Sequence, residues 1–127
     1  MEDIIIRGAP TEYVCKSGAL DELEDKLVSR NIKRVLIVSG VKSWYAARYY
    51  FPSLKSIHVS HVFYKGQCTV TEISRVAALA QSHSVDAIIG VGGGKVLDVV
   101  KAAASTSETK AILIPTLASN CAPWTPL

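Results

Sequence analysis

A run of three glycines followed by a lysine is the pattern in this sequence best suited to carry chemistry. Gly92, Gly93 and Gly94 have no Cβ atoms, so an anion can approach their backbone N–H groups closely. A helix that begins here adds the positive end of its dipole, and Lys95 can neutralise a phosphate. Asp98 lies one helical turn further on and faces the same way. The pattern therefore predicts a phosphate or pyrophosphate site.

Two widespread phosphate motifs do not fit this run. A P-loop requires Ser or Thr directly after its Gly-Lys pair, whereas this sequence has Val96 there. The dinucleotide fingerprint G-x-G-x-x-G requires a glycine where Lys95 stands, and it follows the first strand of a fold rather than a late one. A kinase-like nucleotide site is therefore not indicated. The alternative that the glycines only form a tight strand-to-helix turn, without a ligand, stays open.

The glycine run lies within an alternation of strands and helices. Buried parallel strands are predicted at 35–38, 57–59, 87–89 and 111–114. One helix is predicted between Ser17 as N-cap and Asn31 as stop, with Asp21 and Glu22 in its first turn, and another from Thr69 to His83, with Thr69 and Glu72 as a capping box. This alternation predicts an α/β fold, a Rossmann-like doubly wound parallel sheet with helices on both faces. Segments 4–6 and 13–15 are possible antiparallel edge strands.

Composition narrows the classes of function. The chain has 127 residues, 49% hydrophobic and 20% charged, which suits one soluble domain. Its net charge is +3 and its Lys and Arg residues are dispersed, so we expect no nucleic-acid partner. No apolar run reaches the roughly 18 residues of a membrane span, and the N-terminus lacks the basic flank of a signal peptide. Three cysteines without a CxxC pair favour a reducing, cytoplasmic setting.

Two motifs taken together resemble the iron-containing alcohol dehydrogenase superfamily, and within it glycerol dehydrogenases most. They are GGGKVLDVVKA at 92–102 and IPTLAS at 114–119, and Gly18-Ala19-Leu20 adds to the match. The resemblance implies that residues 1–127 form an N-terminal dinucleotide-binding domain. It places the helical, metal-binding C-terminal domain outside these residues. It also implies hydride transfer between a secondary alcohol or polyol and NAD or NADP, with zinc or iron held by the full-length parent only.

The resemblance also assigns site residues. Gly93, Gly94, Lys95 and Asp98 would contact the pyrophosphate and the nicotinamide ribose, Thr116 and Ser119 would line the adenine and ribose side, and Thr125 and Leu127 would lie near the nicotinamide. Gly92 completes the glycine turn of this cofactor site. No catalytic residue and no metal ligand is assigned within the chain, and a homo-oligomer is expected.

Two positions depart from the family pattern. Glycerol dehydrogenases typically read S-T-D-A-P where this chain has Ser119-Asn120-Cys121-Ala122-Pro123, so Cys121 replaces the aspartate that approaches the substrate hydroxyls. Relatives that use NAD often carry Asp after the first Rossmann strand, whereas the matching stretch 38–41 contains Gly40. Glycerol as the substrate and the choice between NAD and NADP are therefore both open.

Other conspicuous residues are predicted to carry no chemistry. His58 and His61 lie three apart on or beside a strand and point to opposite faces, and His83 closes a helix, so none is predicted to ligate a metal. The aromatic residues Trp44, Tyr45, Tyr49, Tyr50 and Phe51 are predicted to pack on the sheet in the core. Cys15 and Cys68 are predicted to be buried or half-buried.

Two other readings of the sequence remain. A dehydroquinate synthase or glycerol-1-phosphate dehydrogenase relative would have a similar fold and the same glycine turn, although Ala118-Ser119-x-x-Ala122-Pro123 favours the alcohol branch. A non-catalytic nucleotide-binding module would keep the phosphate turn and lose the chemistry. Cys121 in place of Asp is compatible with that second reading.

Overall fold

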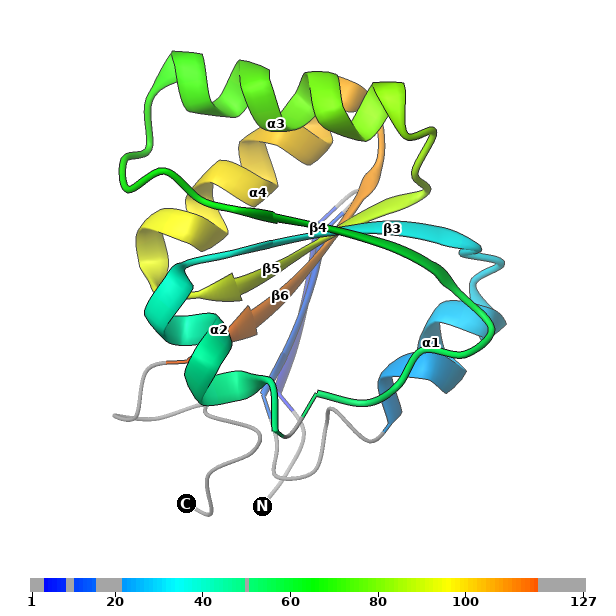
Figure 1. Cartoon of the computed structure of the whole chain (residues 1–127). Coiled ribbons are helices and arrows are strands. Elements are labelled where there is room, and N and C mark those ends of the chain that lie inside the picture. Colours follow the sequence, from blue (N-terminus) through cyan, green and yellow to red (C-terminus); the bar gives the residue numbers. More distant parts are fainter. Residues whose placement is uncertain (1–3, 9–10, 16–21, 50, 117–127) are drawn as a thin grey trace.

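The computed structural model describes residues 4–8, 11–15, 22–49 and 51–116, and for 4–15 it describes the backbone alone. In chain order the elements are β1 (Ile4–Gly8), β2 (Thr11–Cys15), α1 (Leu23–Ser29), β3 (Arg34–Ser39), α2 (Val41–Ala47), β4 (His58–Phe63), α3 (Val70–Ser82), β5 (Ala87–Gly92), α4 (Gly94–Ser107) and β6 (Lys110–Pro115) (Figure 1). No helix of the described part is both long and apolar enough to cross a membrane.

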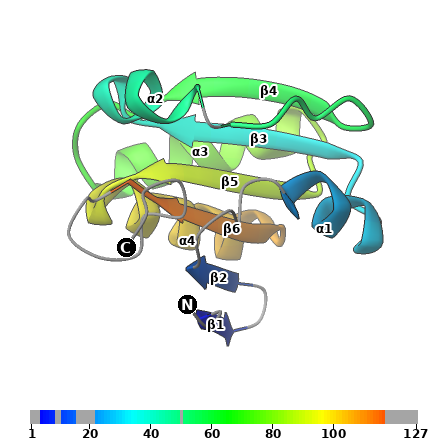
Figure 2. The same ribbon diagram turned by 90° about the horizontal axis from the view of Figure 1, so that it is seen from below.

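The strands form one six-stranded sheet with the order β1-β2-β6-β5-β3-β4 (Figure 2). All strands except β1 run parallel to one another. β1 pairs with β2 in the antiparallel sense. The predicted antiparallel edge is therefore confirmed for β1. It is confirmed for β2 as well, because β2 is the other strand of this antiparallel pair; β2 also pairs with β6 in parallel register and so joins the edge to the parallel sheet.

Helices cover both faces of the sheet, which confirms the doubly wound architecture (Figure 1). Successive side chains of a strand point to opposite faces. On β3, Leu36 and Val38 pack with α3 and α4, whereas Val35 and Ile37 pack with α1 and α2. Each face thus has its own buried apolar cluster, and the strands at the centre of the sheet are buried from both sides.

The helix ends agree with the sequence in part. Thr69 caps α3 by accepting a hydrogen bond from the Glu72 backbone N–H at 3.1 Å, as predicted, and His83 is the C-cap of that helix. Asn31 follows α1 with a φ of 59°, the left-handed conformation in which a helix commonly stops. The predicted start of α1 is wrong, because Glu22 is its N-cap and the helix begins at Leu23. The expected cap, Ser17, lies outside the described residues.

The prediction of a buried strand at 57–59 is wrong in extent and in environment. Ile57 is buried but precedes β4, and β4 itself lies at the edge of the sheet with a mixture of exposed and half-buried residues. Val59 and Phe63 remain 40% and 42% exposed on the face that α2 covers only in part. An edge strand has a neighbour on one side only, so its sequence need not be uniformly apolar.

The aromatic cluster is core only in part. Trp44 and Phe51 are half-buried and their ring centroids lie 5.4 Å apart, as core packing predicts. Tyr45 and Tyr49 are 52% and 79% exposed, which contradicts the prediction. Both rings lie beneath the Arg48 guanidinium, at 4.7 and 5.0 Å from ring centroid to Cζ. This cation–π contact explains how two large rings remain on the surface. Tyr50 lies outside the described residues.

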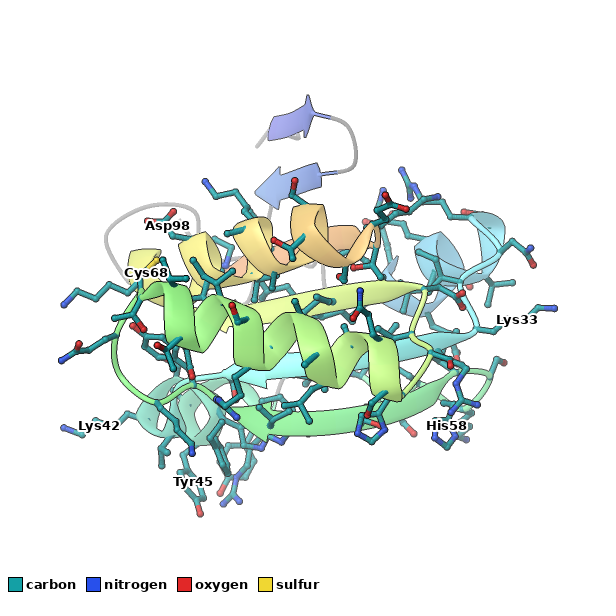
Figure 3. The ribbon with its side chains drawn as sticks, turned by 90° about the horizontal axis from the view of Figure 1, so that it is seen from above. Lys33, Lys42, Tyr45, His58, Cys68 and Asp98 are labelled. Carbon is teal, nitrogen blue, oxygen red and sulfur yellow. The ribbon has the colours of Figure 1, made fainter. Side chains whose placement is uncertain are left out.

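Cys68 was also predicted to be buried or half-buried, and it is exposed. It lies in the connection between β4 and α3 directly before the N-cap Thr69, where neither helix layer covers it. Figure 3 shows Cys68 at the end of the molecule that also presents Asp98 and Lys42. The side chain of Cys15 is not among those described.

Candidate cofactor-binding site

The glycine turn connects the buried strand β5 to the 14-residue helix α4. Gly93 is the N-cap of α4, so this cap offers no side chain that could occupy the first backbone N–H groups of the helix. Within the described part of the chain, no side chain from this cap competes with an external acceptor for those N–H groups and the positive end of the helix dipole. This is the strand–turn–helix context that the sequence predicted for an anion site.

Two glycines of the turn, Gly92 and Gly94, differ in how the fold constrains them. Gly92 has a φ of 154°, and a Cβ added to it would lie 3.1 Å from Val96 Cγ2. The fold itself therefore requires glycine at position 92. A Cβ at Gly94 would have no described atom within 4 Å, so the fold leaves open space beside this residue. That space at a helix N-terminus is where an anionic ligand would fit.

Gly90 brings α4 close to the sheet behind this turn. A Cβ at Gly90 would lie 2.9 Å from Val100 Cγ2 and 3.4 Å from Leu97 Cδ2. Both contacts come from the buried face of α4, so glycine at this strand position sets the distance between helix and strand. The N-terminus of α4 is fixed by this packing rather than by the turn alone.

The turn lies where the winding of the sheet reverses direction. β3 continues through α2 to β4 on one side, and β5 continues through α4 to β6 on the other side and across the opposite face. β3 and β5 are adjacent, with Ser39 opposite Val91, so the strands end together at Gly40 and Gly92. Crevices at such reversals are the usual ligand sites of open α/β sheets.

The third strand end at this edge belongs to β6. Thr116 follows β6 and donates its backbone N–H to the Gly92 carbonyl oxygen at 3.1 Å. Gly40, Gly92 to Gly94 and Thr116 are therefore brought to one edge of the sheet, as the site assignment requires. Gly40 has an ordinary φ of −72° and is the N-cap of α2.

The charged residues near the turn are on the surface. Lys95 is exposed in the first turn of α4. Asp98 is exposed one turn further and forms an ion pair with Lys101, with Nζ and Oδ1 3.4 Å apart. Lys42, two residues after Gly40 in the first turn of α2, is also exposed, and Figure 3 places it at the same end of the molecule as Asp98. The start of α4 is therefore open to solvent, and Lys95 is exposed in its first turn.

A hydrogen-bonded pair beside this edge was not anticipated from the sequence. Ser39 is fully buried at the end of β3, and its Oγ lies 2.7 Å from Nε2 of His61 on β4. The His61 ring lies between the rings of Trp44 and Phe63, at centroid distances of 4.5 and 4.8 Å. Burial lowers the pKa of His61, which favours its neutral form. Only the register of β3 against β4 brings these residues together.

Some predicted site residues cannot be placed. Ser119, Thr125, Leu127 and the substrate residue Cys121 lie outside the described residues. Among the residues that are described, no group of three or more His, Cys, Asp and Glu side chains could hold a metal ion. The described residues thus do not fit a catalytic zinc or iron centre, whereas the open, uncapped turn at Gly94 fits a phosphate-bearing cofactor.

Comparisons with known proteins agree with this geometry. A family model described as iron-containing alcohol dehydrogenase matches residues 10–127. The chain is 33% identical over 120 residues to a glycerol dehydrogenase of Thermotoga maritima, covering 93% of this chain and 32% of that protein. A probable glycerol dehydrogenase from Sinorhizobium meliloti has a similar structure, with a TM-score of 0.70 and 29% identity over 87% of this chain and 29% of the other.

A second similar structure is that of an enzyme whose name states its cofactor. NADH-dependent butanol dehydrogenase A from Thermotoga maritima superposes with a TM-score of 0.63 and 26% identity, over 82% of this chain and 27% of that chain. In every one of these comparisons the chain matches most of its own length and a minor part of the other protein. It spans about a third of the length of the curated relatives it matches.

Proposed function

Because the chain belongs to the iron-containing alcohol dehydrogenase family, we propose that it is the cofactor-binding domain of an alcohol or polyol dehydrogenase. The proposed reaction is reversible hydride transfer between a secondary alcohol and the nicotinamide ring of NAD or NADP. Residues 1–127 supply the dinucleotide site. The zinc or iron that polarises the substrate oxygen in such enzymes is assigned to a helical part of the parent enzyme outside these residues.

The open N-terminus of α4 is the observation that carries this proposal. It combines a helix start without a capping side chain, empty space beside Gly94 and a position at the reversal of the sheet. The helix start favours an anion such as a pyrophosphate over an uncharged ligand, and the space and the sheet reversal are where a ligand of an open α/β sheet fits. A tight turn that served the fold alone would need glycine at position 92 but not at position 94.

The chain's own residues would then bind and orient the cofactor. Backbone N–H groups from Gly93 and Gly94 donate to the pyrophosphate, and Lys95 supplies a counter-charge. Gly40, at the end of the neighbouring strand, adjoins the adenosine ribose, and Thr116 borders the same edge. The cofactor, when bound, supplies hydride acceptance and donation.

The substrate is proposed to be a small alcohol or polyol other than glycerol. Cys121 stands where the family pattern has an aspartate that accepts hydrogen bonds from two substrate hydroxyls. A thiol is a weak donor and a weak acceptor, so it replaces those contacts poorly. Sites that lose polar contacts of this kind discriminate less well in favour of the hydroxylated substrate.

NADH titration of the purified chain tests the cofactor site. Gly94→Val places a branched side chain in space that the fold leaves empty, so we expect the fold to persist and NADH affinity to fall at least about tenfold, or about 1.4 kcal/mol. Ala78→Val is the matched control, because it introduces the same branched side chain at an exposed position of α3. Calorimetry provides the affinities and thermal unfolding checks the fold. Equal NADH affinity in the Gly94→Val variant and the unaltered chain would contradict the proposal.

A further inference from the structure

Ser39 is one of the few polar residues that the described part of the chain buries completely. A buried hydroxyl without a partner destabilises a fold, so it needs a hydrogen bond. His61 provides it, with Nε2 2.7 Å from Ser39 Oγ. One of the two groups donates and the other accepts, and the tautomer of the imidazole determines which. Ser39 has no exposed surface, so its hydroxyl cannot meet a substrate and a nucleophilic role is excluded.

The same imidazole also contacts the helix that follows Gly40. Its ring centroid lies 4.5 Å from that of Trp44 on α2, and the Trp44 backbone N–H donates to the Gly40 carbonyl oxygen at 2.9 Å. His61 therefore touches the residue before Gly40 through a hydrogen bond and the first turn of α2 through ring packing. From the edge strand β4 it braces both sides of the Gly40 turn.

We propose that His61 is a positioning residue for the cofactor site, fixing the Gly40 end of β3 through Ser39 and Trp44. This inference rests on the function proposed above, because Gly40 is assigned to the adenosine ribose. A backbone held in advance in its bound conformation loses less conformational freedom when the ligand binds. Without the contacts of His61, the Gly40 turn must become ordered when the cofactor binds. Cofactor affinity then falls while the chain stays folded.

The test compares NADH dissociation constants of four variants and one control variant with that of the unaltered chain. His61→Ala and Ser39→Ala each remove one end of the hydrogen bond, and the double variant removes both. His61→Gln retains a polar group at the position of Nε2. It provides a folded variant for comparison if His61→Ala does not fold. His58→Ala is the matched control, because His58 is exposed on the same strand, as His61 is, but lies at the far end of the molecule from Lys42 and Asp98 (Figure 3).

We expect His61→Ala and Ser39→Ala each to weaken NADH binding about fivefold, the loss of one net hydrogen bond. The double variant should be no weaker than either single one, because both act through one bond. His61→Gln should restore most of the affinity, and His58→Ala should change nothing. In the absence of NADH, the Gly40 amide resonance should shift in His61→Ala and not in His58→Ala.

Four results would overturn the inference. Unchanged NADH affinity in His61→Ala excludes a role in positioning. Losses that multiply in the double variant show that Ser39 and His61 act independently. Equal losses in His61→Ala and His61→Gln, matched by equal losses of thermal stability, identify a merely structural residue. Absence of NADH binding by the unaltered chain refutes the proposed function and this role together. That failure is seen in the unaltered chain itself, whereas a failure of the positioning role alone is seen only when the variants are compared with it.

Discussion

At the scale of single residues, the presence or absence of a side chain at position 40 bears on the choice between NAD and NADP. Gly40 has a φ of −72° that is accessible to any residue, and an added Cβ would meet only Ser43 among the described residues, at ordinary distances of 3.6 Å from Oγ and 3.9 Å from Cβ. The backbone therefore does not require glycine at position 40, in contrast to Gly92, where φ is positive and Val96 is close. A carboxylate in the family pattern at this position accepts hydrogen bonds from the adenosine ribose. Its absence leaves room for a 2′-phosphate.

We predict that the unaltered chain binds NADH and NADPH with affinities that differ by less than about a hundredfold, or nearly 3 kcal/mol. Gly40→Asp should lower NADPH affinity at least about tenfold relative to NADH, because the carboxylate repels the 2′-phosphate. Gly40→Asn is the isosteric, uncharged control and should shift the ratio much less. Competition titrations of the two cofactors measure it. Equal shifts with Asp and Asn would show that volume, not charge, determines the preference.

At the scale of elements, Glu72 joins α3 to the connection that leaves β4. Its side chain is almost buried, and it accepts hydrogen bonds from the Lys65 backbone N–H at 2.8 Å and from Arg75 Nε at 2.7 Å. Arg75 in turn donates to the Phe63 carbonyl oxygen at 3.0 Å. The hydrogen bonds from Arg75 lower the pKa of the Glu72 carboxyl below its ordinary value, more than burial raises it. The ionised form thus stabilises this junction.

Glu72→Gln should therefore destabilise the chain by about 1.5–3 kcal/mol near neutral pH, the cost of losing charge-assisted hydrogen bonds in a buried place. Since the folded-state pKa is lowered, this contribution is complete above the unfolded pKa of about 4.5 and is lost as the pH falls through the lower folded value. Urea unfolding between pH 3 and pH 7 should show the two proteins converging in acid. Asp98→Asn, which alters an exposed ion pair, should cost little at any pH. A constant difference across that range would contradict this account.

The strands that the sequence predicted well are those with helices on both faces. Residues of β3, β5 and β6 are almost uniformly buried, so their apolar runs carry a clear signal. β4 was misplaced because an edge strand mixes exposed and buried positions, and the buried Ile57 just before it resembled the start of a strand. Tyr45 and Tyr49 were misassigned because stacking on Arg48 leaves no mark in the spacing of apolar residues.

The candidate site divides in the same way. The glycine run could be read from the sequence because its chemistry is local: residues adjacent in the chain form the turn. The proximity of Gly40, Gly92 and Thr116 followed from the rule that parallel strands end at one edge. Ser39 and His61 are 22 residues apart in the chain, and the register of β3 against β4 brings them into contact. Their spacing in the sequence does not predict this contact.

At the scale of the whole molecule, the residues of the two buried apolar clusters are distinct from the groups proposed to bind the cofactor. Buried clusters on the two faces contain residues from β3, β5 and the four helices, whereas the proposed site uses backbone groups at the strand ends. Lys95 and Asp98, the charged residues near the glycine turn, are exposed and belong to neither cluster. The proposed metal chemistry has no such support here, because the described residues hold no group of metal ligands.

We therefore predict that the purified 127-residue chain unfolds in one cooperative transition, binds NADH and does not oxidise alcohols, with or without added zinc or iron. The two clusters supply a core on both faces of the sheet, which supports cooperative folding. The proposed reaction places the alcohol oxygen on a Lewis acid, and a catalytic zinc commonly has three protein ligands, which the described residues do not supply. Thermal unfolding, metal analysis and an NAD(P)-coupled assay with secondary alcohols and polyols can be performed on one preparation. Turnover that rises with added metal would show that the chain holds a metal centre of its own, and would overturn the assignment of that centre to another part of the parent enzyme.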